Sequence, residues 1–164
     1  VGKPLPGMQV RIDKPDADGV GEIHLTGPMV MTGYIDKEPI DSDLNTDDIG
    51  YVDEDGFVYI LNRRKDLIIS GGENIYPKEL EDLVYTLPSV KECAVVPVPD
   101  PKWGQVPALF VAFHDGESMT ADEIVSFMTK SLAKYKVPKY VKILPALPRN
   151  GTGKIVRNEL RLED

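Results

Sequence analysis

The sequence predicts an α+β protein, in which a small β-rich subdomain is followed by a compact α+β domain. Short alternating segments, separated by glycine and proline, fill the chain up to about residue 62. A charged segment, residues 62–66, then interrupts the apolar pattern. Beyond it, the apolar residues follow the spacing of helices that alternate with strands. These observations predict a domain boundary at residues 62–66.

The first part is predicted to consist of strands. Residues 8–12 and 21–25 alternate between apolar and polar side chains, which is the pattern of a strand with one buried face. Residues 51–52 and 57–60 flank the acidic loop 53–56, which ends in glycine. A short polar loop of this kind between two strand segments is typical of a β-hairpin.

The second part is predicted to contain both helices and strands. A helix begins at Pro77, where the missing N–H of proline costs nothing, and a helical apolar stripe starts at Leu80. Residues 120–123, Thr-Ala-Asp-Glu, have the form of a capping box and predict a second helix. The remaining predicted elements are strands at about 90–98, 106–113 and 140–144 and a short terminal helix from about residue 155.

Length and composition bound the class of protein. With 164 residues, of which 41% are hydrophobic and 28% charged, the chain can bury a core. No apolar stretch approaches the roughly 20 residues that cross a bilayer, so we expect a cytoplasmic protein without a membrane span. The net charge of −8 disfavours nucleic acid as a partner. The single cysteine, Cys93, lies in an apolar run and is expected to be a buried strand thiol.

Positive charge is concentrated near one end of the sequence. Residues 130–161 carry nine Lys and Arg side chains and a single acid, Glu159. Such a stretch suits a polyanionic ligand, but a solvated surface commonly has the same composition. The residues alone leave both alternatives open.

Two glycine loops are candidate ligand sites. Residues 148–154 look like a phosphate-binding loop, but Pro148 and Ile155 stand where a Walker A motif needs Gly and Ser or Thr. Two glycines before Lys154 are still typical of a mobile loop that can hold the lysine against a phosphate or carboxylate. A turn before the last helix explains these glycines equally well. The glycine pair at 71–72 permits a positive φ and a close approach of a ligand, with a tight structural turn as the alternative.

The remaining polar residues do not define a site by their spacing. His24 and His114 have no ligand-like neighbours in the sequence and are expected to be strand residues, so no metal site is predicted. Residues 45–48, Asn-Thr-Asp-Asp, are either a solvated loop or the source of a carboxylate that accepts hydrogen bonds from a sugar diol.

Four segments, taken in order, resemble the acyl-CoA ligase branch of the adenylate-forming superfamily, which also contains luciferases and the adenylation domains of peptide synthetases. They are residues 21–34, 46–66, 70–77 and 148–154, and the third reads Ser-Gly-Gly-Glu-Asn-Ile-Tyr-Pro. The resemblance covers essentially the whole chain. It implies a reaction in which a carboxylic acid attacks ATP to give acyl-adenylate and pyrophosphate, and the thiol of coenzyme A then displaces AMP.

The resemblance also implies a division of the chain. Residues 1–62 would be the C-terminal end of a large adenylation domain, 63–66 a hinge with Lys65 as its pivot, and 67–164 a mobile α+β lid domain. The phosphate loop and acyl pocket of this family lie upstream. We therefore expect the chain to be a fragment whose main partner is its own N-terminal domain, and expect no adenylation of an acid by the fragment alone.

By motif position, the contacts to ATP or AMP fall on Asp48 and Arg63. Asp48 would accept hydrogen bonds from the ribose hydroxyls, and Arg63 would contact the same ribose and phosphate region. Position 47 carries Asp where the family usually has a small residue such as Gly. Lys154 resembles the catalytic lysine that bridges the substrate carboxylate and the α-phosphate, where an ammonium stabilises charge that develops as pyrophosphate leaves. Mg²⁺ would accompany ATP and has no binding motif in this chain.

The second step would use residues that lie elsewhere. The resemblance assigns one group to the channel for the pantetheine arm of coenzyme A: Gly71, Gly72, Glu73 and Asn74. A second group matches positions near coenzyme A in some relatives: Trp103, Lys136 and Lys139.

The substrate implied by the resemblance is a fatty or aromatic acid, and fatty acid metabolism is one expected setting. Two other functions remain open. An adenylation domain that loads a carrier protein is disfavoured by residues 71–74, and a free-standing binding module would have no enzymatic role.

Overall fold

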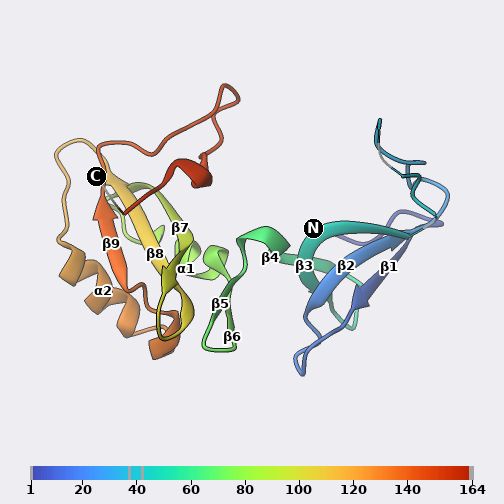
Figure 1. The fold of residues 1–164 in the computed structure, drawn as a ribbon, viewed down its shortest axis with the longest axis horizontal. Coiled ribbons are helices and arrows are strands. Elements are labelled where there is room, and N and C mark those ends of the chain that lie inside the picture. The colour runs from blue at the N-terminus through green and yellow to red at the C-terminus, as the bar shows by residue number, and fades with distance from the viewer. Residues whose placement is uncertain (1, 37, 42, 163–164) are drawn as a thin grey trace. The chain divides into compact units, whose positions relative to one another are not determined.

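A computed structural model describes residues 2–36, 38–41 and 43–162 (Figure 1). The chain divides into two compact units, Val1–Lys65 and Asp66–Asp164. Each unit contains a β-sheet of its own, and the second also contains the helices. No helix among the described residues is long and apolar enough to cross a membrane.

The first unit is an antiparallel sheet whose strands follow the order of the chain. They are β1 (Gln9–Asp13), β2 (Gly21–Thr26), β3 (Asp43–Val52) and β4 (Val58–Arg63). The predicted hairpin is confirmed, since the Phe57 N–H donates to the Asp53 carboxylate at 2.8 Å and Gly56 has φ +81°. Residues 45–48 lie within β3, which excludes the alternative of a solvated loop.

The second unit contains a five-stranded sheet centred on one long hairpin. Its strands are β5 (Ile68–Ser70), β6 (Glu73–Ile75), β7 (Val90–Asp100), β8 (Gly104–Phe113) and β9 (Tyr140–Ile143). β7 and β8 pair antiparallel along their length, and β9 runs parallel to β8. The strands predicted in these three regions are confirmed. The sequence missed β6, because its three residues are too few for an alternating pattern.

Two helices cover one face of this sheet. α1 (Pro77–Val84) has Pro in its first turn, and α2 (Ala121–Thr129) begins with the predicted capping box, in which Thr120 and Glu123 bond reciprocally. Both helices contribute fully buried side chains to a core shared with β7 and β8. These helix residues are Leu80, Val84, Ile124 and Met128.

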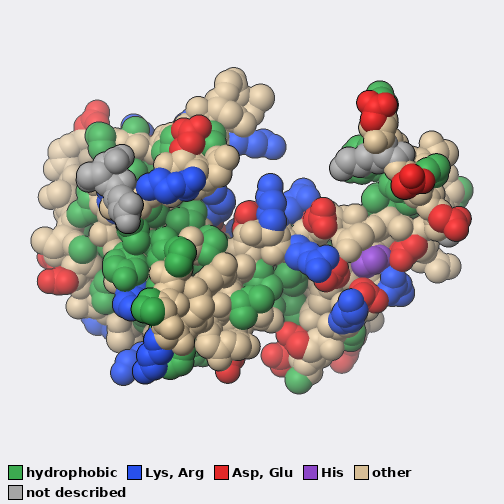
Figure 2. Space-filling model, in the orientation of Figure 1, with side chains coloured by type: hydrophobic (Ala, Val, Ile, Leu, Met, Phe, Trp, Pro, Cys, Tyr) green, Lys and Arg blue, Asp and Glu red, His purple; other side chains and the backbone are tan. Residues whose placement is uncertain are grey.

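The C-terminal segment packs against a second set of sheet residues. On β7 and β8 these are Ala94, Val96, Ala108, Phe110 and Ala112, and Leu147 and Leu160 bury against them. Three of the five are alanines, which leave room for the segment to lie close to the strands. Hydrophobic side chains are visible over the second unit in Figure 2.

The predicted terminal helix from residue 155 is wrong. The chain there forms only a three-residue 3₁₀ helix, Arg157–Glu159. The segment must extend along the sheet to bury Leu160, so contacts with the sheet outweigh the local tendency to form a longer helix. The last part of the prediction, residues 163–164, lies outside the described residues.

Candidate functional site

Asp48 and Arg63, the predicted nucleotide residues, are register partners on β3 and β4. Arg63 Nε lies 2.8 Å from Asp48 Oδ1, and Arg63 Nη1 donates to the carbonyl oxygen of Thr46 at 3.2 Å. The carboxylate is 15% exposed, whereas the Arg63 side chain is 57% exposed. The arginine therefore orients a nearly buried carboxylate and presents its own charge to solvent, which suits a diol next to a phosphate.

The backbone next to Asp48 has an unusual conformation. Asp47 has φ +58°, in the left-handed region that favours glycine, and its N–H donates to Asn45 Oδ1 at 2.8 Å. The strand register also shifts between Ile49 and Gly50. Aspartate is among the few residues that enter this region readily, so the chain can accommodate Asp at a position where the family usually has a small residue.

A cavity of about 400 Å³ adjoins this pair within the first unit, lined by Asp47, Arg63, Arg64 and Lys65. Three of these four residues are cations, which favours a phosphate-bearing ligand. Lys65 is also the last residue of the first unit. Its role as a pivot stays a prediction.

Lys154 lies on a tight loop of the C-terminal segment, and its side chain is exposed. Asn150 organises the loop, because its Oδ1 accepts the N–H groups of Thr152 at 3.1 Å and Lys154 at 2.9 Å. The Asn150 N–H donates in turn to the Lys154 carbonyl oxygen at 2.9 Å. The loop is therefore an ordered turn, and the Lys154 ammonium has no protein partner among the residues that the structure describes.

Two Glu–Arg pairs flank this loop, and the sequence did not predict them. Arg149 pairs with Glu92 of β7, and Arg157 pairs with Glu81 of α1 at 2.6 Å. Both glutamates are buried, at 4% and 8% exposure. Glu92 is the one acid in the apolar run at residues 90–98, whereas Glu81 lies between two other acids, Glu79 and Asp82. Neither pairing could be predicted from the spacing of these residues.

The Glu92 carboxylate stays ionised despite its burial. Desolvation by itself would raise the pKa of Glu92, but the Leu147 N–H and the Arg149 guanidinium stabilise the charged form and hold the pKa below its ordinary value. The pair is therefore a charged contact within the second unit.

Gly71 and Trp103, both predicted to lie near coenzyme A, are brought together. The Gly71 N–H donates to the Trp103 carbonyl oxygen at 2.9 Å. A Cβ atom on Gly71 would lie 2.7 Å from Trp103 Cε3, and Gly71 has φ +59°. Gly72 has φ +91° but has open space around it. Trp103, which is 47% exposed as a residue, thus packs its indole ring directly on a residue that must lack a side chain.

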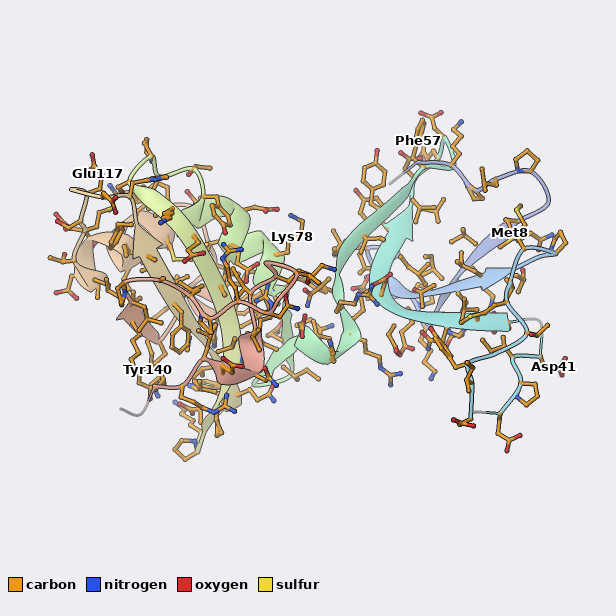
Figure 3. All side chains as sticks on the ribbon, turned by 90° about the horizontal axis from the view of Figure 1, so that it is seen from above. Met8, Asp41, Phe57, Lys78, Glu117 and Tyr140 are labelled. Carbon is orange, nitrogen blue, oxygen red and sulfur yellow. The ribbon has the colours of Figure 1, made fainter. Side chains whose placement is uncertain are left out.

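Asp100 holds the turn that carries Trp103. Its Oδ1 accepts the N–H groups of Lys102 at 2.8 Å and Trp103 at 2.9 Å, and its Oδ2 accepts from the Lys139 ammonium. The Lys139 hydrogen bond, followed by these backbone donors, lowers the pKa of Asp100 to about 2. Lys139 Nζ also lies 5.8 Å from the ring centre of Tyr140, which is labelled in Figure 3. Asp100 therefore connects Trp103 and Lys139, two predicted coenzyme A residues.

The other predicted coenzyme A residues make their contacts outside the cluster formed by Gly71, Asp100, Trp103 and Lys139. The Lys136 ammonium binds Glu79 of α1 at 2.7 Å. Glu73 and Asn74 are exposed residues of β6. Among the described residues, no hydrogen bond or ion pair joins these three side chains to Trp103.

Two segments are anchored toward opposite ends of β7 (Figure 1). They are the Lys154 loop, residues 149–154, and the Trp103 turn, residues 100–103. Glu92 lies near its start and Asp100 is its last residue. At about 3.3 Å per residue, the two anchors are roughly 26 Å apart along the strand. One small sheet thus carries two separate candidate surfaces.

The remaining candidates do not form a catalytic site. His24 Nδ1 lies 3.0 Å from Asp43 Oδ2, a neighbour that the sequence did not predict, and His114 follows β8 without belonging to it. No group of His, Cys, Asp or Glu within the described ranges could hold a metal ion. Cys93 is a buried β7 residue, as predicted, and burial raises its pKa to about 12, so its thiol is not a nucleophile.

Comparison with known proteins gives consistent matches along the chain. Residues 79–154 match the family described as AMP-binding enzyme C-terminal domain. The chain is 54% identical over 161 residues to a 2-succinylbenzoate--CoA ligase of Lactococcus lactis, and the match covers 98% of this chain and 35% of that protein.

Solved structures agree with this result. A Bacillus subtilis o-succinylbenzoate CoA synthetase in complex with its acyl-adenylate intermediate is 40% identical, with a TM-score of 0.88 over 99% of this chain and 35% of that one. ATP-bound MatB from Rhodopseudomonas palustris is 36% identical, with a TM-score of 0.88 over 98% and 35% of the two chains. The chain spans about 35% of the length of these relatives.

Proposed function

This chain belongs to the acyl-CoA ligase branch of the adenylate-forming superfamily, and we propose that it serves an ATP-dependent ligase that joins 2-succinylbenzoate to coenzyme A. The observation that carries the proposal is that the Lys154 loop and the Trp103 turn are both anchored to one sheet, in a chain that is 54% identical to a 2-succinylbenzoate--CoA ligase. The first surface suits acyl-adenylate formation, and the second suits the transfer to a thiol.

In the first step, Asp48 would accept hydrogen bonds from the ribose hydroxyls of ATP. Its Oδ2 would do so, because Arg63 binds Oδ1. Arg63 would face the phosphates with its exposed guanidinium. Lys154, whose ammonium has no partner among the described residues, would lie between the acid carboxylate and the α-phosphate. There it stabilises the negative charge that develops as the carboxylate attacks and pyrophosphate leaves.

In the second step, the glycine turn at residues 71–72 and the Trp103 ring would border the path of the pantetheine arm. Lys139 would offer positive charge beside them, although part of that charge is already neutralised by Asp100. The thiol then attacks the acyl-adenylate and AMP leaves. We propose that Lys65 is the pivot whose backbone torsions allow the change between the two steps.

The choice of acid follows from the names of the relatives. The Lactococcus lactis and Bacillus subtilis proteins are both named for succinylbenzoate, which is an aromatic acid. This supports the aromatic half of the expectation from the sequence, and fatty acid metabolism has no comparable support.

The test of this function measures pyrophosphate release by the complete natural protein that contains residues 1–164. We expect release with ATP, Mg²⁺ and 2-succinylbenzoate, at least tenfold slower release with octanoate, and a thioester only when free coenzyme A is added. Transfer to a carrier protein but not to coenzyme A would contradict the proposal and favour a carrier-loading adenylation domain.

The 164-residue chain alone is expected to release no pyrophosphate with any acid. It spans about 35% of the relatives, so most of the ATP and acyl site of such an enzyme would be absent. Turnover by a purified 164-residue polypeptide, free of any contaminating ligase, would contradict this expectation.

A further inference from the structure

We propose that Glu92 and Arg149 form a positioning pair that sets the Lys154 loop for the adenylate-forming step. This inference rests on the proposed function of Lys154. Neither side chain is proposed to touch the substrates. Their role would be to fix the backbone that carries the lysine relative to the rigid sheet.

The pair begins in the core of the second unit. Glu92 is a β7 residue with 4% exposure, and each of its carboxylate oxygens has a partner. Oε1 accepts the Leu147 N–H at 2.8 Å, and Oε2 accepts Arg149 Nε at 3.0 Å together with Nη2. Leu147 is itself buried at 4% exposure. One carboxylate therefore holds both the backbone that enters the loop and the arginine that follows.

Arg149 carries this anchor into the loop. Its third nitrogen, Nη1, donates to the carbonyl oxygen of Gly153, the residue directly before Lys154. The same guanidinium thus bridges a strand of the sheet and the far side of the loop. The planar fork of arginine can make these contacts simultaneously, whereas the single ammonium of a lysine cannot.

Ile155, the residue after Lys154, also packs against the sheet core, but the remaining hydrogen bonds of the loop do not replace the connection through Arg149. Asn150 bonds only to other loop residues, so it sets the internal shape of the turn but not its position on the sheet. At the base of the loop, the Val156 N–H donates to the Pro148 carbonyl oxygen at 2.8 Å. Because Lys154 has no side-chain partner among the described residues, its place depends on this backbone. A misplacement of about 1 Å can slow a reaction by about 10²-fold.

The two half-reactions distinguish positioning from general stability. In the proposed mechanism, Lys154 acts only in the first step, so a positioning pair should matter for that step alone. A purely structural pair would reduce the fraction of folded enzyme and so affect both steps equally. Tyr85 offers a matched control, because its hydroxyl bonds to the backbone of Cys93 on the same strand and it makes no hydrogen bond to the described residues 149–154.

The experiment uses the complete natural protein and its Arg149→Lys, Glu92→Gln and Tyr85→Phe variants. Single-turnover acyl-adenylate formation is measured at saturating ATP and acid, and thioester formation is measured separately from supplied acyl-adenylate and coenzyme A. For Arg149→Lys and Glu92→Gln we expect adenylate formation to slow about 10- to 100-fold and thioester formation to stay within about twofold. Tyr85→Phe should leave both rates within about twofold.

Amide hydrogen exchange of residues 150–154 gives a readout that does not depend on activity. We expect faster exchange in Arg149→Lys and Glu92→Gln and unchanged exchange in Tyr85→Phe. Unchanged exchange in both pair variants, normal adenylate formation in both, or equal losses in the two steps would overturn the inference. A wild-type protein that forms no acyl-adenylate would overturn the proposed function instead. The amide exchange rates would in that case still test whether the pair Glu92 and Arg149 fixes the loop.

Discussion

Gly71 shows how one residue shapes the surface proposed for coenzyme A. Its φ of +59° is costly for any residue with a side chain, and the Trp103 ring occupies the space that a Cβ atom would need. The Gly71 N–H also bonds to the Trp103 carbonyl oxygen. Backbone conformation and packing therefore both require glycine at this position.

We predict that Gly71→Ala destabilises the second unit by about 1–2 kcal/mol through its backbone conformation alone, and that it also displaces Trp103. Trp103 is the single tryptophan of the 164 residues, so its fluorescence reports on the displacement directly. Gly72→Ala is the matched control, because Gly72 also has a positive φ but has nothing within 4 Å. A spectral change of equal size in both variants would contradict the packing argument.

The Asp100 carboxylate gives the second unit a predictable response to acid. Its pKa falls from 3.8 to about 2 on folding, so its contribution to stability is present above pH 3.8 and is lost as the pH falls toward about 2. We predict that Asp100→Asn is less stable than wild type at pH 6, and that this difference shrinks between pH 4 and pH 2. Urea denaturation across this range measures it, and a difference that does not vary with pH would contradict the assignment.

At the scale of the element, β7 is an edge strand of the sheet. Side chains form the hydrogen bonds to backbone groups on its unpaired side. The Tyr85 hydroxyl bonds to both backbone groups of Cys93. The Val95 N–H donates to Glu81 at 2.7 Å, and the Val95 carbonyl oxygen accepts from Arg157 at 2.8 Å. These side chains replace a missing neighbouring strand, which protects an otherwise exposed edge from pairing with other chains.

We predict that Glu81→Ala destabilises the second unit by about 3 kcal/mol, because it leaves the Val95 N–H without its acceptor and Arg157 without its counter-charge. The double variant Glu81→Ala with Arg157→Ala should lose less than the sum of the single losses, since the two side chains share one interaction. Chemical denaturation of the four proteins measures this coupling. Additive losses would show that the pair does not act as a unit.

The elements that could be predicted from the sequence are those fixed by local chemistry. The capping box at Thr120 and the proline start at Pro77 act within one helical turn, and β7 and β8 follow from their apolar composition. The terminal helix was wrong because burial of Leu160 on the sheet decides the path of the chain there. A local pattern cannot report such a distant contact.

The same limit applies to the candidate site. The resemblance to a family supplied Lys154, Asp48 and Arg63 as expectations by motif position. It did not supply the pair Glu92 and Arg149, which lie 57 residues apart in the sequence. The contact depends on where the C-terminal segment crosses the sheet, so only the folded structure could reveal it.

At the scale of the whole molecule, the proposed functional groups are divided between the two units of the chain. The first unit carries the proposed ribose pair, Asp48 and Arg63, and the second carries both the Lys154 loop and the Trp103 turn. With anchors roughly 26 Å apart along β7, these two surfaces cannot both meet the same reacting atoms at one time. A reaction in two steps at one centre would therefore require the second unit to present each surface in turn.

The most direct test of this account is the Lys154→Ala variant of the complete natural protein, with each half-reaction measured separately. We predict that acyl-adenylate formation falls by about 10²- to 10³-fold, in line with the loss of one charge-stabilising group. Thioester formation from supplied acyl-adenylate should remain within about twofold of wild type. Lys130→Ala, which removes another exposed lysine of the second unit, should change neither rate. Equal losses in the two half-reactions of Lys154→Ala, or none in the first, would contradict the account.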